Sequence, residues 1–277
     1  MAAVCYNPSS PNLSRLQKGN AMRNIRLPIF FLCLVLLALT LTAANTGPVQ
    51  ASGGQTYYVA ATGNDGGPGT LAQPWHTIQH AVDSVSAGDT VLVRGGTYNE
   101  AVFINVSGSA VNGAVKLQNY PGETAALDGS GFSSADGDIG ISITDQSYIT
   151  IQGFEIRNYS TTNSNATPMG IFVTGASHHI QLINNHIHNI ETHAGANGNA
   201  HGLAVYGSSA PASIHDLLIQ GNELDHLLLG SSEALAVNGN VEFFTAAKNI
   251  VHDNDNIGMV FIGFEGVAPD QIGRAHV

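Results

Sequence analysis

The segment Gly170-Ile171-Phe172-Val173 opens a repeat that closes with Asn185-His186-Ile187-His188-Asn189. Equivalent openings begin at residues 140, 202, 234 and 258, so the spacings are 30, 32, 32 and 24 residues. Each unit holds three short stretches of alternating apolar and polar residues, separated by Gly, Asn, Ser and Asp. Such a unit cannot bury its apolar face alone and must stack on copies of itself. The repeat therefore predicts an all-β fold, a right-handed parallel β-helix.

The chain before the regular repeats has a different pattern. Ile78, Ala81, Val82 and Val85 recur at helical spacing, which predicts an amphipathic α-helix over residues 78–85 that caps the first turn. Within the repeats, Asn185, Asn222 and Asn249 occupy equivalent places, and we expect them to form a ladder of stacked amides. We interpret the domain as a single β-helix over residues 52–270.

Residues 1–51 have the features of an N-terminal extension and a signal peptide. Arg23 and Arg26 precede an uncharged run from residue 27 to 44, and small residues lead up to Ser52. Met22 is the better start of translation. We predict export to the extracellular space, the periplasm or the cell surface, with no stable membrane insertion after cleavage. A membrane anchor is the alternative, because the run is at the lower limit of length for spanning.

Residues 271–277 break the repeat. Ile272-Gly273-Arg274-Ala275-His276-Val277 matches the translated start of a widely used sequencing adapter. We hypothesise that this tail is an artefact and that further turns follow Asp270 in the natural protein.

The net charge limits which partners the protein can bind. Residues 52–270 contain twenty acidic and four basic residues, a net charge of −16; the basic ones are Arg94, Lys116, Arg157 and Lys248. This body has no basic patch to hold nucleic acid. A polyanionic substrate needs bound cations to overcome the repulsion. Both cysteines, Cys5 and Cys33, precede residue 52, so disulfides do not hold this body together.

Several segments resemble the amino-terminal part of secreted pectate-lyase-like β-helix proteins; they include Gly63-Asn64-Asp65, Pro74-Trp75-His76-Thr77-Ile78-Gln79 and Arg94-Gly95-Gly96-Thr97-Tyr98. Family nine pectate lyases are nearest, and the chondroitinase B and alginate lyase group comes next. The resemblance implies a polysaccharide partner and cleavage of an acidic polysaccharide of the pectate or alginate type by β-elimination. It also implies calcium as cofactor and a Lys or Arg base.

The chain departs from that family at the calcium stretch. The family reads roughly Asn-Ala-Asp-Gly-Phe-Ala, whereas this chain reads Asn199-Ala200-His201-Gly202-Leu203-Ala204, and Tyr206 stands where the family's Lys is expected. His201 replaces a hard oxygen ligand, which disfavours calcium at that position. The outward positions of the repeat-opening strands carry no Lys or Arg. Lys248 and Arg157 are the remaining candidates for the base, unless it lies in missing turns.

Alternation assigns outward side chains to the repeat-opening strands. Phe172, Tyr206 and Asn238 point outward, and His201 lies at the strand edge, so these four are the predicted substrate contacts. The two aromatic rings suit stacking on sugars, but stacking between solenoid turns explains them equally well. We interpret His178, His179, His186 and His188 as surface residues.

The loops that enter these strands carry the predicted metal ligands, Glu191, Glu233, Asp253 and Asp255. Successive turns repeat at about 4.8 Å, so we expect these carboxylates to share one rim with His201 and to converge on Ca²⁺. Ordinary turn formation also favours Asp and Asn. Zinc held by Glu191, His193 and His201 is a further alternative, although the spacing fits no specific motif.

Two function classes remain open. The first is a polysaccharide lyase with a cation-assisted mechanism. The second is a non-catalytic glycan-binding or surface structural module, which the absence of a Lys or Arg base favours. In either case we expect a monomer.

Overall fold

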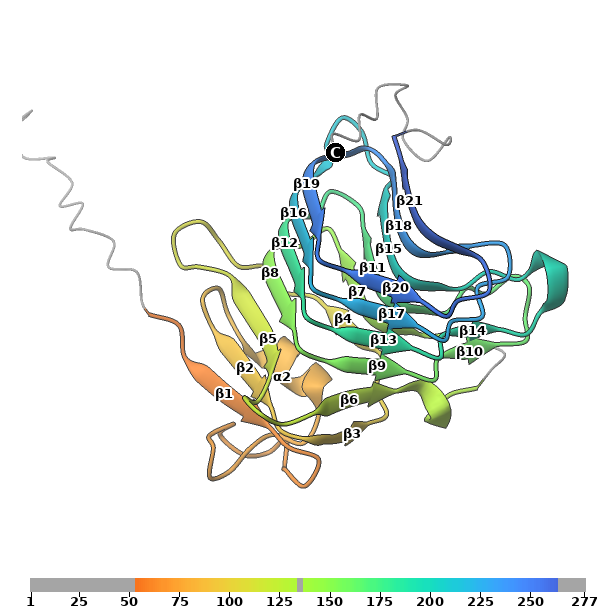
Figure 1. Cartoon of the computed structure of the whole chain (residues 1–277). Helices are drawn as coiled ribbons and strands as arrows, with labels where there is room; N and C mark the ends of the chain where they lie inside the picture. The colour runs from red at the N-terminus through yellow and green to blue at the C-terminus, as the bar shows by residue number, and fades with distance from the viewer. Residues whose placement is uncertain (1–52, 134–136, 264–277) are drawn as a thin grey trace, which may run out of the picture. The chain divides into compact units, whose positions relative to one another are not determined.

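The structure, a computed structural model, describes residues 53–133 and 137–263. The chain winds as a parallel β-solenoid, and from residue 90 on each turn passes through the same three sheets in the same order (Figure 1). The predictions on the signal peptide and on the tail lie outside the described residues. Within the described part, no helix is long and apolar enough to cross a membrane.

Every strand pairing within the three main sheets is parallel. The first sheet contains, in order, β1 (Thr56–Val59), β2 (Thr90–Val93), β5 (Val115–Asn119), β8 (Ser147–Gln152), β12 (His178–Ile183), β16 (Ile214–Gln220) and β19 (Val241–Ala247). The second sheet contains β4 (Val102–Ile104), β7 (Ile139–Thr144), β11 (Met169–Thr174), β15 (His201–Gly207), β18 (Glu233–Gly239) and β21 (Ile257–Ile262). The third sheet contains β3 (Gly96–Tyr98), β6 (Ala125–Asp128), β9 (Glu155–Arg157), β13 (His186–His188), β17 (Glu223–Asp225) and β20 (Ile250–His252).

Short elements complete the turns. A fourth, two-stranded sheet pairs β10 (Ser160–Thr161) with β14 (Glu191–Thr192). Two 3₁₀ helices, η1 (Gly129–Gly131) and η2 (Gly195–Asn197), lie in the connections that follow β6 and β14.

The interior is built from rows of identical or similar side chains. Ile171 pairs in register with Leu203, and Leu203 with Leu235, and all three are fully buried. Inward-pointing side chains of the three sheets enclose one continuous apolar core. The predicted fold and interior row are both confirmed.

The predicted helix is present as α2 (Ile78–Ser84) and ends one residue before Val85. The Thr77 side chain accepts a hydrogen bond from the His80 N–H and so caps the helix start. Glu100 accepts the N–H groups of the first two helical residues. The buried face, Ile78, Ala81 and Val82, packs where α2 contacts β1, β2 and β4.

The predicted amide ladder is confirmed where the first sheet turns into the third. Asn185 Nδ2 donates to Asn222 Oδ1, and Asn222 Nδ2 donates to Asn249 Oδ1, each at 3.0 Å. The same oxygens accept the backbone N–H groups of Asn185 and Asn222. Each amide therefore satisfies backbone groups that the sharp corner leaves outside the strand ladders.

The last residue of each repeat closing has a left-handed backbone. Asn158, Asn189, His226 and Asp253 follow equivalent strands of the third sheet and have φ values between 51° and 62°. Asn, Asp and His tolerate this conformation better than other residues with a side chain. The last position of the closing motif therefore carries residue types that suit the left-handed backbone of a corner.

The opening glycine of the repeat permits close approach between turns. A Cβ added to Gly170 meets Ile187 Cγ2 at 2.4 Å and the Gly202 carbonyl oxygen at 2.6 Å. We expect Gly170→Ala to lower the free energy of unfolding by roughly 1–3 kcal/mol, because the added methyl group overpacks the core. Urea denaturation measures this change.

Gly258→Ala is the matched control for this glycine. It changes the same motif position in the last described turn, where the nearest atom to the new Cβ, Val251 Cγ1, lies at 3.4 Å. An equal loss of stability in both variants would contradict the packing explanation.

Candidate functional site

The outward face of the second sheet carries two aromatic rings on neighbouring turns. Phe172 and Tyr206 are both half-buried, and their rings meet edge to face with centroids 5.8 Å apart. Register places Ala204 beside Phe172 and places Asn238 beside Tyr206 on the following turn. The rings thus contact each other, as the inter-turn alternative requires, and each keeps an exposed part for a ligand.

His201 lies directly beneath this face and is hydrogen-bonded at both ring nitrogens. His201 Nδ1 lies 2.9 Å from the Glu233 carbonyl oxygen, and His201 Nε2 lies 2.8 Å from the Tyr206 hydroxyl. A carbonyl oxygen only accepts, so Nδ1 carries the proton in neutral His201. Nε2 then accepts the proton of Tyr206. Burial lowers the pKa of His201, which keeps the imidazole neutral near pH 7.

The structure buries His201 and Asn238 more than strand alternation leads one to expect, and their contact with substrate stays a prediction. His201 is 3% exposed and Asn238 is 9% exposed, so neither offers a ligand much surface. Strand alternation alone does not reveal such burial. Tyr206 is the group through which His201 reaches the surface.

We expect His201 to titrate below 6.5, its ordinary value, because burial opposes the charged form. As pH falls below 6.5, the unfolded chain binds a proton at this site before the folded chain does. The contribution of His201 to stability therefore declines from about pH 6.5 down to its folded pKa and changes no further below it. Imidazole resonances followed by NMR test this, and a His201 midpoint at or above 6.5 would contradict it.

The four predicted metal ligands all lie in the connections from the third sheet to the second, or at the entry to the second sheet. Their nearest partners differ: Glu191 contacts His193 at 2.8 Å, Asp253 contacts His252 at 2.8 Å, Asp255 accepts the Leu229 N–H at 2.7 Å, and Glu233 Oε2 lies 3.8 Å from His201 Nδ1. In residues 53–133 and 137–263, no three of these carboxylates gather with ligand atoms within 4.8 Å of one another. The expected convergence within that distance is not observed: Glu191 and Asp253 contact neighbours in the sequence, whereas Glu233 and Asp255 contact the preceding turn. The set as placed does not fit a calcium site.

Neither candidate base lies on the second sheet. Lys248 has a left-handed backbone, with φ of 57°, at the corner between β19 and β20. Arg157 lies on β9 of the third sheet, where its guanidinium contacts Asp128 at 2.9 Å and also Glu155. The hydrogen bond to Asp128 has the largest effect and, together with that to Glu155, raises the pKa of Arg157. Arg157 therefore holds its proton more firmly. Both residues therefore lie away from the aromatic face, and their role as bases stays a prediction.

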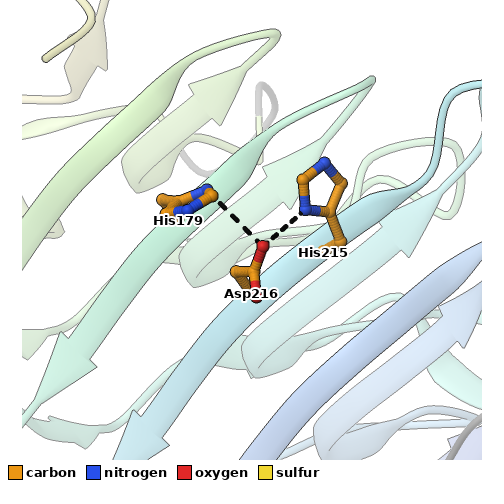
Figure 2. A group of neighbouring side chains, drawn as sticks. All are labelled: His179, His215 and Asp216. Atoms are coloured by element: carbon orange, nitrogen blue, oxygen red, sulfur yellow. Dashed lines mark hydrogen bonds and ion pairs between the residues drawn. The ribbon is translucent and has the colours of Figure 1, made fainter. Parts of the chain in front are cut away.

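The sequence interpretation missed one cluster of histidine and aspartate side chains. His179, His215 and Asp216 converge on the outer face of the first sheet (Figure 2), where the sequence interpretation places His179 only as a surface residue. The available signal was the pair of adjacent polar residues at equivalent repeat positions, 178–179 and 215–216.

The model of a family described as Pel9A-like, right handed beta helix region, matches residues 57–226, more than half of the chain. The chain belongs to the Pel9A-like right-handed β-helix family. The resemblance to family nine pectate lyases inferred from the sequence is thereby confirmed.

Individual proteins are also similar to this chain in sequence or in fold. The chain is 38% identical over 242 residues to the uncharacterized protein YwoF of Bacillus subtilis, covering 84% of this chain and 51% of that protein. It is 32% identical over 138 residues to the pectate lyase PEL9 of Emericella nidulans, covering 49% of this chain and 32% of that enzyme. A solved rhamnogalacturonan lyase shares the fold, with a TM-score of 0.51 and 19% identity over 76% of this chain and 63% of its own. The chain thus spans about half of one curated relative and a third of the other.

Proposed function

We propose that this Pel9A-like chain is part of an exported carbohydrate-active protein that cleaves an acidic polysaccharide of the pectate or alginate type. The observation that carries the proposal is the Tyr206 hydroxyl held on His201 Nε2, 2.8 Å away, on the exposed face beside Phe172. Tyr206 stands where the family resemblance leads us to expect the Lys base. A phenol with a proton acceptor behind it can replace an amine in proton transfer.

β-Elimination needs one proton removed and one returned. In the proposed step Tyr206 Oη takes the C5 proton of a uronate while its own proton passes to His201 Nε2. The C5–H electron pair forms the C4=C5 double bond, and the C4–O4 bond breaks with its electrons on O4. O4 then takes a proton from the Tyr206 hydroxyl, and His201 returns the proton it holds to Tyr206, so all atoms and charges balance.

Glu233 supports the charged state of His201 in this step. Burial disfavours imidazolium, but the Glu233 carboxylate lies 3.8 Å from His201 Nδ1 and attracts the positive charge as it forms. Phe172 and the Tyr206 ring supply apolar surface on which a sugar ring stacks.

The cation dependence of this activity is proposed from charge alone. A body with a net charge of −16 repels a polyuronate unless cations bridge the two. A divalent cation such as calcium would neutralise the uronate carboxylate and so acidify C5. We derive no step from a calcium ligand set, because the four candidate carboxylates do not form one.

We expect chelator to abolish product formation and added Ca²⁺ to restore it. The measurement incubates the full chain with polygalacturonate and, separately, with alginate, and follows the ultraviolet absorbance of the unsaturated uronate product. Na⁺ at matched ionic strength is the control, because it screens charge without bridging. Undiminished activity in chelator would contradict the cation mechanism while leaving the proton-transfer pair standing.

A second candidate function is a glycan-binding module without catalysis. The absence of Lys and Arg from β7, β11, β15, β18 and β21 favours it, since the related lyases use such a base. Its test is the same incubation followed by affinity electrophoresis in gels that contain each polysaccharide. Retarded migration with no unsaturated product would select this function.

A further inference from the structure

The first sheet has a row of residues that breaks strand alternation in the same place on successive turns. Tyr148, His179, Asp216 and Phe243 have φ values of 56°, 54°, 54° and 50°, and they occupy equivalent register positions. In a regular strand, adjacent side chains point to opposite faces. Here the residue before each of these four is also accessible, whereas the residue after it is buried. Two consecutive side chains therefore face outward on every one of these turns.

This geometry brings nitrogen and oxygen donors of two turns to one place. His215 Nδ1 lies 2.8 Å from Asp216 Oδ2, both on β16, and His179 Nδ1 of β12 lies 3.7 Å from the same oxygen (Figure 2). The three ligand atoms lie within 4.8 Å of one another. Donors around a tetrahedral zinc ion lie about 3.3 Å apart, the edge of a tetrahedron whose corners lie about 2.05 Å from its centre. Small rotations of these side chains are enough to reach that spacing.

The surroundings hold the rings in place and leave room for further ligands. Tyr148 stacks on His179 with ring centroids 4.3 Å apart, and His178 stacks on His215 at 4.9 Å. His178 Nδ1, 3.0 Å from His179 Nδ1, is the nearest further nitrogen donor. His179 and Asp216 also line a depression of about 360 Å³, so water has access.

We propose that His179, His215 and Asp216 form a binding site for a divalent transition-metal ion, with Zn²⁺ as its representative. Two imidazoles and one carboxylate are donors that Zn²⁺, Ni²⁺ and Cu²⁺ prefer, whereas Ca²⁺ prefers oxygen only. The ion joins β12 to β16 and so ties two consecutive turns together. This site lies on the first sheet, whereas Tyr206 and His201 lie on the second. The proposal of a metal site therefore does not depend on the proposed function.

Calorimetric titration of ZnCl₂ into the full chain, with any affinity tag removed, tests the site. We expect one Zn²⁺ per chain and a Kd that rises by at least about tenfold in His179→Asn, His215→Ala and Asp216→Asn. Asn is chosen at positions 179 and 216 because it tolerates their left-handed backbone. Excess Ca²⁺ leaves the zinc Kd unchanged.

His226→Asn is the matched control, since it also replaces an accessible histidine with a left-handed backbone, φ 51°, but at the corner that follows β17 of the third sheet. Zinc at about one hundred times its Kd raises the melting temperature by about 5 °C in the wild type and in this control. The double variant His179→Asn/His215→Ala shows no such rise. Wild-type zinc affinity in that double variant, absence of zinc binding by the wild type, or equal loss in His226→Asn would overturn the proposal.

Discussion

Asn222→Ala is expected to lower the free energy of unfolding by about 3–5 kcal/mol and the melting temperature by about 10 °C. Asn222 is fully buried, and its Oδ1 accepts from both the N–H and the Nδ2 of Asn185. Its Nδ2 donates to the Leu182 carbonyl oxygen and to Asn249 Oδ1. Alanine leaves the Asn185 N–H with no acceptor and removes one of the two acceptors of Asn185 Nδ2, which keeps the Ile151 carbonyl oxygen. An unpaired buried donor costs about 1–3 kcal/mol.

Urea denaturation measures the change. An unchanged slope of the unfolding free energy against urea concentration shows that the variant exposes as much surface on unfolding as the wild type. Asn165→Ala serves as the control, because Asn165 is exposed in the connection between β10 and β11. We expect that control to change stability by less than about 0.5 kcal/mol. A loss below 1 kcal/mol in Asn222→Ala would show that water or backbone adjustment replaces the ladder.

The amide ladder and the interior rows were predictable because the residues that form them occupy the same position in each repeat of the sequence. Asn185, Asn222 and Asn249 stand at the same place in each unit, and parallel stacking turns equal places into contacts. The row of Ile171, Leu203 and Leu235 follows from alternation alone. Neither inference needs knowledge of how a loop folds.

The candidate sites were harder to predict because they depend on what breaks the repeat. The left-handed residues His179 and Asp216 bring two adjacent side chains to one face, which period-two alternation forbids. Glu191 lies on the short strand β14 and contacts His193, whereas Asp255 lies in the connection before β21 and accepts the Leu229 N–H of the preceding turn; sequence spacing encodes neither contact. The burial of His201 depends on its contacts with Tyr206 and Glu233, which lie on its own and the following turn.

The Tyr206 hydroxyl separates the two candidate functions. Tyr206→Phe keeps the ring that meets Phe172 edge to face and removes only the group hydrogen-bonded to His201. If Tyr206 transfers the C5 proton, we expect kcat to fall by about 10² or more while KM changes little, because proton transfer by a positioned side chain contributes about that factor. Initial rates of unsaturated product on polygalacturonate or alginate give both constants.

Tyr206→Ala completes the comparison, since it removes the ring as well. For the lyase, this variant loses the same factor in kcat and also weakens substrate binding by up to about tenfold, the value of one aromatic stacking contact. For a binding module, Tyr206→Phe binds the glycan as the wild type does, and only Tyr206→Ala weakens binding. Full lyase activity in Tyr206→Phe would rule out the proton-transfer role, because no hydroxyl then stands between His201 Nε2 and the substrate.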